Sequence, residues 1–201
     1  MANQLPFQPD TILRLDNEKH TEFFGKILAQ AISLAPLLPC QPAIFLYGGL
    51  GSGKTTLVRA LAANLPGGDK AEVASPSFTL ANEYPTCPRM VHADLYRLGH
   101  ASSLPEEIEE SLANGAWLVM EWPEYLAAAN IFTDRLNILL GTRSWLPSLL
   151  NHSEIMTYLD ISNQPCETER LVMVSAQGFF FSDLLRSLHP ALEKHFRSLR
   201  P

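Results

Sequence analysis

One stretch constrains the fold of this chain more than any other, namely AIFLYGGLGSGKTTLVRAL from Ala43 to Leu61. It begins with five apolar residues, a pattern typical of a strand buried on both faces. Four glycines, a lysine and two threonines follow, and apolar residues then recur at helical spacing until PGG at 66–68. We therefore predict a central strand, a glycine-rich loop and a helix over 54–65. The residues expected to face inward from this helix are Leu57, Val58, Leu61 and Leu65.

Residues 48–55 match G-x-x-x-x-G-K-[ST], the P-loop pattern. Glycines suit such a loop because it turns successive backbone N–H groups toward a phosphate and leaves no room for a Cβ. The following helix adds unpaired N–H groups, Lys54 adds a charge for the β- and γ-phosphates, and the Thr55 hydroxyl suits Mg²⁺. A guanine-specific N-K-x-D loop is absent, which favours ATP over GTP. The predicted nucleotide-binding residues of the loop are Gly49, Leu50, Gly51, Ser52, Gly53, Lys54, Thr55 and Thr56.

Two acidic residues follow strand-like runs and are candidates for the metal that a P-loop requires. Glu121 follows WLVM, an apolar run typical of a Walker B strand, and Asp94 follows the weaker run MVHA. We predict that Glu121 and Thr55 hold the metal, while Asp94 acts on the metal's water shell or on the attacking water. The two acids can also exchange these roles. Lys54, which faces the phosphates, is the second predicted catalytic residue.

The segment SPSFTL, residues 75–80, lies between the loop and the two acids. Pro76 makes the segment stiff, and Ser75, Ser77 and Thr79 supply hydroxyls that can sense a γ-phosphate and Mg²⁺ as a switch. An ordinary surface loop is the alternative.

Two aromatic residues near the acids have open roles. We interpret His92 as structural rather than catalytic. Trp122, which directly follows Glu121, either covers the nucleotide site or belongs to the core.

Strand-like and helical segments alternate along the chain, which indicates an α/β architecture. We predict a three-layer P-loop NTPase fold, a small single domain with a mostly parallel central sheet and a C-terminal helical extension. Asp16 or Asn17 should cap the first helix. The predicted strands are 11–15, 43–47, 90–92, 117–120, 135–140 and 171–174, and the predicted helices are 18–33, 54–65, 105–114 and 182–197.

The expected domain organisation is a P-loop ATPase domain over 1–175, with an insertion at 142–169, and a helical extension over 176–201. Apolar residues recur at spacing four in the extension, which favours packing over exposure. These residues are Leu184, Leu188, Leu192 and Phe196.

Composition narrows the classes of partner. The chain has 15 basic and 21 acidic residues and a net charge of −6, so it is a poor candidate for binding DNA or RNA unaided. No secretory signal and no run of about 20 apolar residues is visible, so we expect no membrane contact. Three distant cysteines offer neither a disulfide framework nor a metal pattern. The expectation is a cytoplasmic protein.

Four segments together resemble the TsaE (YjeE) family, namely GGLGSGKTTLVRAL, SPSFTL, HADLYRL and LVMEWPE in that order. The resemblance covers about residues 13–125, and DLYRL followed by EWP is its specific part. It implies a P-loop ATPase that binds Mg-ATP and is required for threonylcarbamoyladenosine (t6A) modification of tRNA. It also implies that the protein acts with the TsaD–TsaB pair, resets that complex by hydrolysis and meets tRNA only through these partners.

The resemblance also implies roles for individual residues. Lys54 and Thr55 would hold phosphate and Mg²⁺, Glu121 would be the second metal-side residue, and Asp94 would be the acid needed for hydrolysis. By the same resemblance, residues 75–77 match the family's switch and residues 16–18 the place where the first helix meets the base. The resemblance implies that Trp122 lies near the nucleotide.

Some features depart from the family pattern. Ser77 stands where the family usually has threonine, and a glycine often seen in the helix between DLYRL and EWP is missing. Residues beyond 141 make this chain longer than is typical, and SWLPSLLNHSEIMTYL and the C-terminal tail have no clear counterpart.

Two other functions share the P-loop. A small-molecule or nucleotide kinase would need several arginines around an acceptor, whereas residues 55–134 offer only Arg59, Arg89 and Arg97 in that role. A nucleotide-dependent interaction module, in which ATP sets a conformation and hydrolysis is incidental, fits the same motifs.

Overall fold

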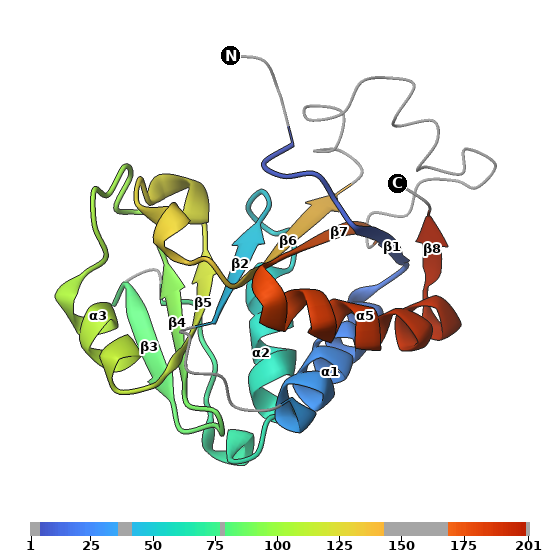
Figure 1. Ribbon diagram of the computed structural model, residues 1–201, viewed down its shortest axis with the longest axis horizontal. Coiled ribbons are helices and arrows are strands. Elements are labelled where there is room, and N and C mark those ends of the chain that lie inside the picture. The colour runs from blue at the N-terminus through green and yellow to red at the C-terminus, as the bar shows by residue number, and fades with distance from the viewer. Residues whose placement is uncertain (1–4, 36–41, 77–78, 143–168, 200–201) are drawn as a thin grey trace.

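A computed structural model describes residues 5–35, 42–76, 79–142 and 169–199 of the chain, and its framework is one eight-stranded sheet. The strand order is β3-β4-β5-β2-β6-β7-β1-β8 (Figure 1). The strands are β1 Thr11–Leu15, β2 Ala43–Tyr47, β3 Ala81–Tyr84, β4 Met90–Asp94, β5 Trp117–Glu121, β6 Arg135–Thr142, β7 Arg170–Gln177 and β8 Arg197–Leu199. The helices are α1 Glu18–Leu34, α2 Lys54–Asn64, α3 Glu106–Ala113 and α5 Gly178–His195.

The centre of the sheet is parallel and its two margins are antiparallel. Strands β4, β5, β2 and β6 pair in parallel, whereas β3, β7, β1 and β8 join the sheet in antiparallel pairs. The predicted α/β fold with a parallel core is thus confirmed. Because β2, β4 and β5 run the same way, their carboxyl ends meet at one edge of the sheet, where ligands bind in such folds.

Helices cover both faces of the sheet and give three layers. Helices α1, α2 and α5 share one apolar core with the sheet, while α3 and the turns after β5 pack on the opposite face. Helix α1 packs against both α2 and α5, and Figure 1 shows α5 beside α1. None of the helices in the described part of the chain has the length and apolar character needed to cross a membrane.

Helix α1 begins where the sequence predicts. The Asn17 side chain accepts a hydrogen bond of 3.1 Å from the His20 amide, which decides between the two predicted caps. A Cβ at Gly25 would lie 2.7 Å from the Ala60 Cβ, so this glycine allows α1 to approach α2 closely. That approach brings the start of α1 next to the glycine-rich loop.

Helix α5 begins at Gly178, four residues before the predicted start, and it continues through Pro190. Its first turn is capped from elsewhere in the chain, because an Asp134 carboxyl oxygen accepts a hydrogen bond of 2.9 Å from the Phe180 amide. A cap supplied by a residue so distant in sequence leaves no local signal. The predicted packing of the apolar row is confirmed, since Leu184, Leu188, Leu192 and Phe196 are all buried.

Two strands were not predicted. Strand β3 has four residues and only one of them is buried, so its sequence lacks the alternation of a half-buried strand. After α5 the chain does not stay helical, as predicted to 197, but turns into β8, which pairs with β1. The predicted insertion at 142–169 begins at the last residue of β6, Thr142, whose register partner Arg170 is the first residue of β7. Residues 143–168 lie outside the described part of the chain.

Gly178 offers a test of the non-local cap. It has φ +80°, and a Cβ there would collide with the Asp134 carboxyl group. Gly115 has a similar φ of +82° but open space around it. We expect Gly115→Ala to cost about 1–2 kcal/mol of unfolding free energy through backbone strain, and Gly178→Ala to cost clearly more. Urea denaturation of both variants measures the difference, and equal losses would contradict the role of the cap.

Candidate nucleotide-binding site

The glycine-rich loop connects β2 to α2 at the carboxyl edge of the parallel strands. Gly48, Gly51 and Gly53 have φ values of +140°, +72° and +102°, which favour glycine. A Cβ at Gly48 would also collide with the Leu140 carbonyl oxygen on β6. The backbone angles and the limited space therefore both require glycine in this loop. Helix α2 begins where the loop ends, and the N–H groups of its first turn have no carbonyl partner within the helix.

Lys54 is buried and turned back into the loop. Its Nζ donates hydrogen bonds to the carbonyl oxygens of Gly48 at 2.8 Å and Gly49 at 3.0 Å, and lies 4.1 Å from the Trp122 ring centroid. Burial lowers the pKa of Lys54, and the negative charges of Glu121, Asp94 and Glu124 oppose that effect. A buried ammonium held by neutral carbonyls gains most from an added anion, so this position fits a bound phosphate.

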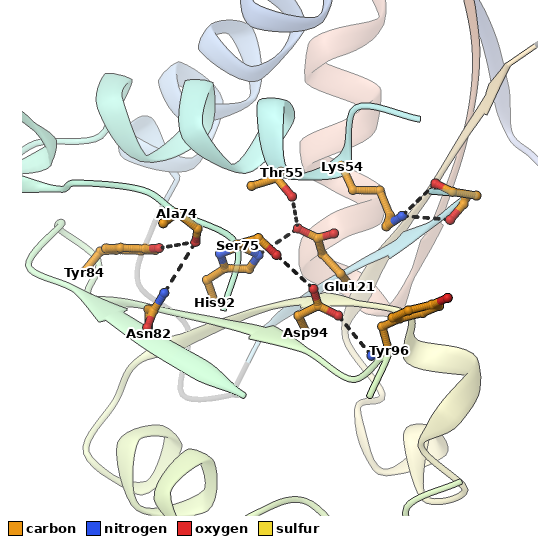
Figure 2. Close-up of polar contacts among 12 residues, drawn as sticks. Lys54, Thr55, Ala74, Ser75, Asn82, Tyr84, His92, Asp94, Tyr96 and Glu121 are labelled. Carbon is orange, nitrogen blue, oxygen red and sulfur yellow. Dashed lines mark hydrogen bonds and ion pairs between the residues drawn. The ribbon is translucent and has the colours of Figure 1, made fainter. Parts of the chain in front are cut away.

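The two predicted acids lie side by side. Asp94 and Glu121 are register partners at the carboxyl ends of β4 and β5, and both are buried. The Thr55 hydroxyl donates a hydrogen bond of 2.8 Å to Glu121 Oε1 (Figure 2). Two oxygen ligands on neighbouring corners of a Mg²⁺ octahedron are about 3 Å apart, given metal–oxygen distances of about 2.1 Å. The pair therefore fits Mg²⁺.

No group of three or more His, Cys, Asp or Glu side chains placed to hold a metal occurs among the described residues. A Mg²⁺ ion bound here would be held by few protein oxygens together with phosphate oxygens and water.

Asp94 is held by a separate set of contacts. Its Oδ2 accepts a hydrogen bond of 3.1 Å from the Ser75 hydroxyl, and its Oδ1 accepts one of 3.0 Å from the Tyr96 amide. Of the three predicted switch residues, Ser75 thus contacts an acid of the site. Thr79 donates instead to Asn82 Oδ1 at 2.9 Å and does not line the cavity, while Ser77 lies outside the described residues.

Trp122 adopts a backbone conformation that is rare for its residue type, with φ +59° and ψ +49°. This conformation turns the chain just after Glu121. The Trp122 ring lies over Lys54 Nζ, and its centroid is 4.9 Å from that of the Tyr96 ring. Strain of this kind concentrates at functional sites. Trp122 lines the cavity and packs against the core on the α3 side, so it combines the two predicted alternatives.

A cavity of about 250 Å³ lies at the centre of these groups. The residues that line it are Leu50, Gly51, Ser52, Gly53, Lys54, Thr55, Thr56, Ser75, Asp94, Tyr96, Glu121 and Trp122. Nearly all the predicted site residues therefore come together, and Gly49 contributes through its carbonyl bond to Lys54. A larger, mostly apolar cavity of about 630 Å³ lies between α1 and α5 and shares no lining residue with the first, so the cavity at the loop is the candidate nucleotide site.

His92 was interpreted as structural, yet it touches the site. It is fully buried, and its Nε2 lies 3.0 Å from Glu121 Oε1. The alternation of β4 puts His92 on the same face as Asp94, so strand register could have indicated this contact.

Arg170 was not predicted at all. It reaches from the start of β7 to the outside of the loop, donating to the carbonyl oxygens of Ser52 at 3.1 Å and Gly51 at 3.3 Å. A second cavity of about 230 Å³ lies there, between the start of α1 and the loop. Its lining residues are Glu18, Thr21, Gly51, Gly53, Thr56 and Arg170. Residues 16–18 adjoin this cavity. They are the residues at which the first helix is expected to meet the base of the nucleotide.

A family model described as "Threonylcarbamoyl adenosine biosynthesis protein TsaE" matches residues 15–144. The chain belongs to the TsaE family. Among curated relatives, proteins named tRNA threonylcarbamoyladenosine biosynthesis protein TsaE from Aquifex aeolicus and Rickettsia felis are 42% and 34% identical over 47% and 57% of this chain. The chain spans about two thirds of those two relatives, 67% and 64% of their lengths. The TsaE protein of Synechocystis is 36% identical over 55% of this chain and 74% of its own length.

A solved structure extends the likeness of the fold. The crystal structure of Bacillus subtilus YdiB superposes with a TM-score of 0.58 at 18% identity, covering 92% of this chain and 98% of that one. Such coverage exceeds the part that the family model matches, so the likeness in fold extends beyond residues 15–144.

Lys54 gives the most direct test of the phosphate site. Lys54→Ala removes the buried charge that would meet the phosphates of a bound nucleotide, so we expect ATP affinity to fall by more than about tenfold, or ~1.4 kcal/mol. Calorimetric titration with ATP measures the loss, and Lys26→Ala, an exposed lysine on α1, is the matched control. A loss smaller than tenfold, or an equal loss in the control, would argue against the assignment of Lys54.

Proposed function

We propose that this chain binds Mg-ATP at the glycine-rich loop and hydrolyses it as part of t6A modification of tRNA, together with a TsaD–TsaB complex. Family membership and the names of the relatives support the pathway. The observation that carries the ATPase assignment is the meeting of Lys54, Thr55, Glu121 and Asp94 at one cavity beside the loop.

The proposed roles follow from these positions. The loop amides, the start of α2 and Lys54 hold the phosphates, and Thr55 with Glu121 holds the metal. Bound Mg²⁺ supplies charge neutralisation at the phosphate oxygens. Asp94 lies one strand further from the loop and orients the attacking water or the metal's water shell.

Slow turnover by the isolated chain is part of the proposal. Both carboxyl oxygens of Asp94 accept hydrogen bonds, from Ser75 and Tyr96, so the Ser75 segment helps to set the orientation in which Asp94 meets a water molecule. Two arginines that could supply positive charge at the phosphates are placed elsewhere. Arg170 contacts the loop carbonyls from the outer side, and Arg97 is exposed. In this proposal, a partner that reorganises the Ser75 segment changes the orientation of Asp94 and thereby accelerates hydrolysis.

The same contact suggests how the partner senses the nucleotide. Ser75 is exposed to solvent as a residue, while its hydroxyl reaches the buried Asp94. A γ-phosphate near Asp94 would change this contact and the surface that the segment presents. The interaction-module alternative differs only in making hydrolysis incidental.

Isosteric variants separate the two acids. We expect both Asp94→Asn and Glu121→Gln to slow hydrolysis, because each removes a charge at the phosphates. Glu121→Gln should also weaken the Mg²⁺ dependence, whereas Asp94→Asn should leave ATP binding largely intact. Turnover and a Mg²⁺ titration of each variant provide the measurement. A Mg²⁺ titration unchanged in Glu121→Gln would reverse the two roles.

The partner assignment predicts a nucleotide-dependent complex. We expect tighter binding to a TsaD–TsaB pair with ATP than with ADP, since an ordered Ser75 segment offers one fixed surface. Contact with tRNA should be indirect, because a chain with net charge −6 gives counterion release little to act on. Titration of the pair under each nucleotide and filter binding of tRNA test this. Equal partner affinities, or sub-micromolar tRNA binding by the chain alone at physiological salt, would falsify it.

A further inference from the structure

We infer that His92 is a positioning residue, which fixes the Glu121 carboxylate in the orientation that a metal ion requires. The inference rests on the proposed Mg-ATP function. Its starting point is that one oxygen atom, Glu121 Oε1, receives contacts from two elements, Thr55 Oγ1 at 2.8 Å and His92 Nε2 at 3.0 Å (Figure 2).

The surroundings of His92 decide which ring nitrogen carries its proton. An ionised carboxylate only accepts hydrogen bonds, so Nε2 must be the donor to Glu121. The other nitrogen, Nδ1, is buried and has no hydrogen-bond partner among the described residues. A proton on Nδ1 would leave a buried N–H group unpaired, at a cost of about 1–3 kcal/mol. A proton on Nε2 directed at Glu121 is therefore the arrangement that fits the geometry.

Packing alone does not explain a histidine here. The neighbours of His92 on its face of the sheet are mixed in character, with Met90 and Asp94 two residues away on β4, Val119 and Asn82 as register partners on β5 and β3, and the Tyr84 ring 6.2 Å away. An apolar side chain would fill this space without leaving an unpaired nitrogen. What the imidazole adds is one directed N–H group toward Glu121.

That N–H group restricts the carboxylate of Glu121. The Thr55 hydroxyl can rotate and can donate in several directions, whereas the imidazole is held by the strand and by close packing on all sides. Partners that orient a metal-binding carboxylate in this way typically change metal affinity or activity by 10–100-fold when removed. His92 thus acts on the metal through Glu121, not by touching it.

The test compares the affinity for a non-hydrolysable ATP analogue in Mg²⁺ with the affinity in EDTA, by calorimetry. His92→Leu removes the N–H group, and His92→Gln keeps an N–H donor at similar reach. The gain from Mg²⁺ is the ratio of the affinity in Mg²⁺ to the affinity in EDTA. We expect this gain to be at least about tenfold smaller in His92→Leu than in the wild type. The affinity in EDTA should stay within twofold of the wild type. His92→Gln should retain most of the gain.

Two controls separate positioning from stability. Val119→Ala shortens the register partner of His92, so it should lower the thermal unfolding midpoint while keeping the full gain from Mg²⁺. In a Glu121→Gln background, His92→Leu should cause no further loss of that gain, because the carboxylate that it orients is gone.

The outcomes distinguish this inference from the proposed function. If the wild type gains no affinity from Mg²⁺, the Mg-ATP function fails and the inference with it. If the wild type gains affinity and His92→Leu gains as much, or if Val119→Ala loses the gain equally, only the inference is overturned. Should His92→Leu not fold, long-range ¹H–¹⁵N NMR of the wild type still tests the claim, since a proton on Nδ1 instead of Nε2 would refute it.

Discussion

The hydrogen bond between Thr55 and Glu121 is the point at which the separate parts of this fold meet. Thr55 belongs to the first turn of α2, whose position follows from the loop glycines, and Glu121 ends β5. The two approach to 2.8 Å only because β2 and β5 pair in parallel, with Leu46 opposite Glu121. Changing the register of this pair by one residue would turn the carboxylate to the opposite face of the sheet.

Burial of charge shapes the rest of the site. Lys54, Asp94 and Glu121 are all nearly inaccessible to solvent, and an isolated buried charge is very unfavourable. Each is compensated by a different group, namely the loop carbonyls, Ser75 with the Tyr96 amide, and Thr55 with His92. The three charged groups are thus hydrogen-bonded within the protein, whereas two buried polar atoms of the same region, Ser52 Oγ and His92 Nδ1, have no partner among the described residues.

The sequence predicted the parts of the site that lie within contiguous segments, and it missed the contacts made between distant segments. The loop, α2 and the two acids were found because their signals are contiguous, and the resemblance to the family added their order. Arg170, which holds the loop from β7, and Asp134, which caps α5, act over long separations that no periodicity records. Strand β8 was missed because three residues at the end of a helical pattern carry no strand signal.

The charges around the cavity also explain why a metal should accompany the nucleotide. One ammonium faces two carboxylates, so these three buried groups sum to a negative charge before any phosphate arrives. At an effective dielectric constant of about 20, two unit charges 4 Å apart interact by about 4 kcal/mol. A triphosphate next to Glu121 and Asp94 would be repelled on that scale, and the start of α2 contributes only about half a positive charge. A divalent cation held by Glu121 would offset this repulsion, so under the proposed function the acids that disfavour free ATP would favour its magnesium complex.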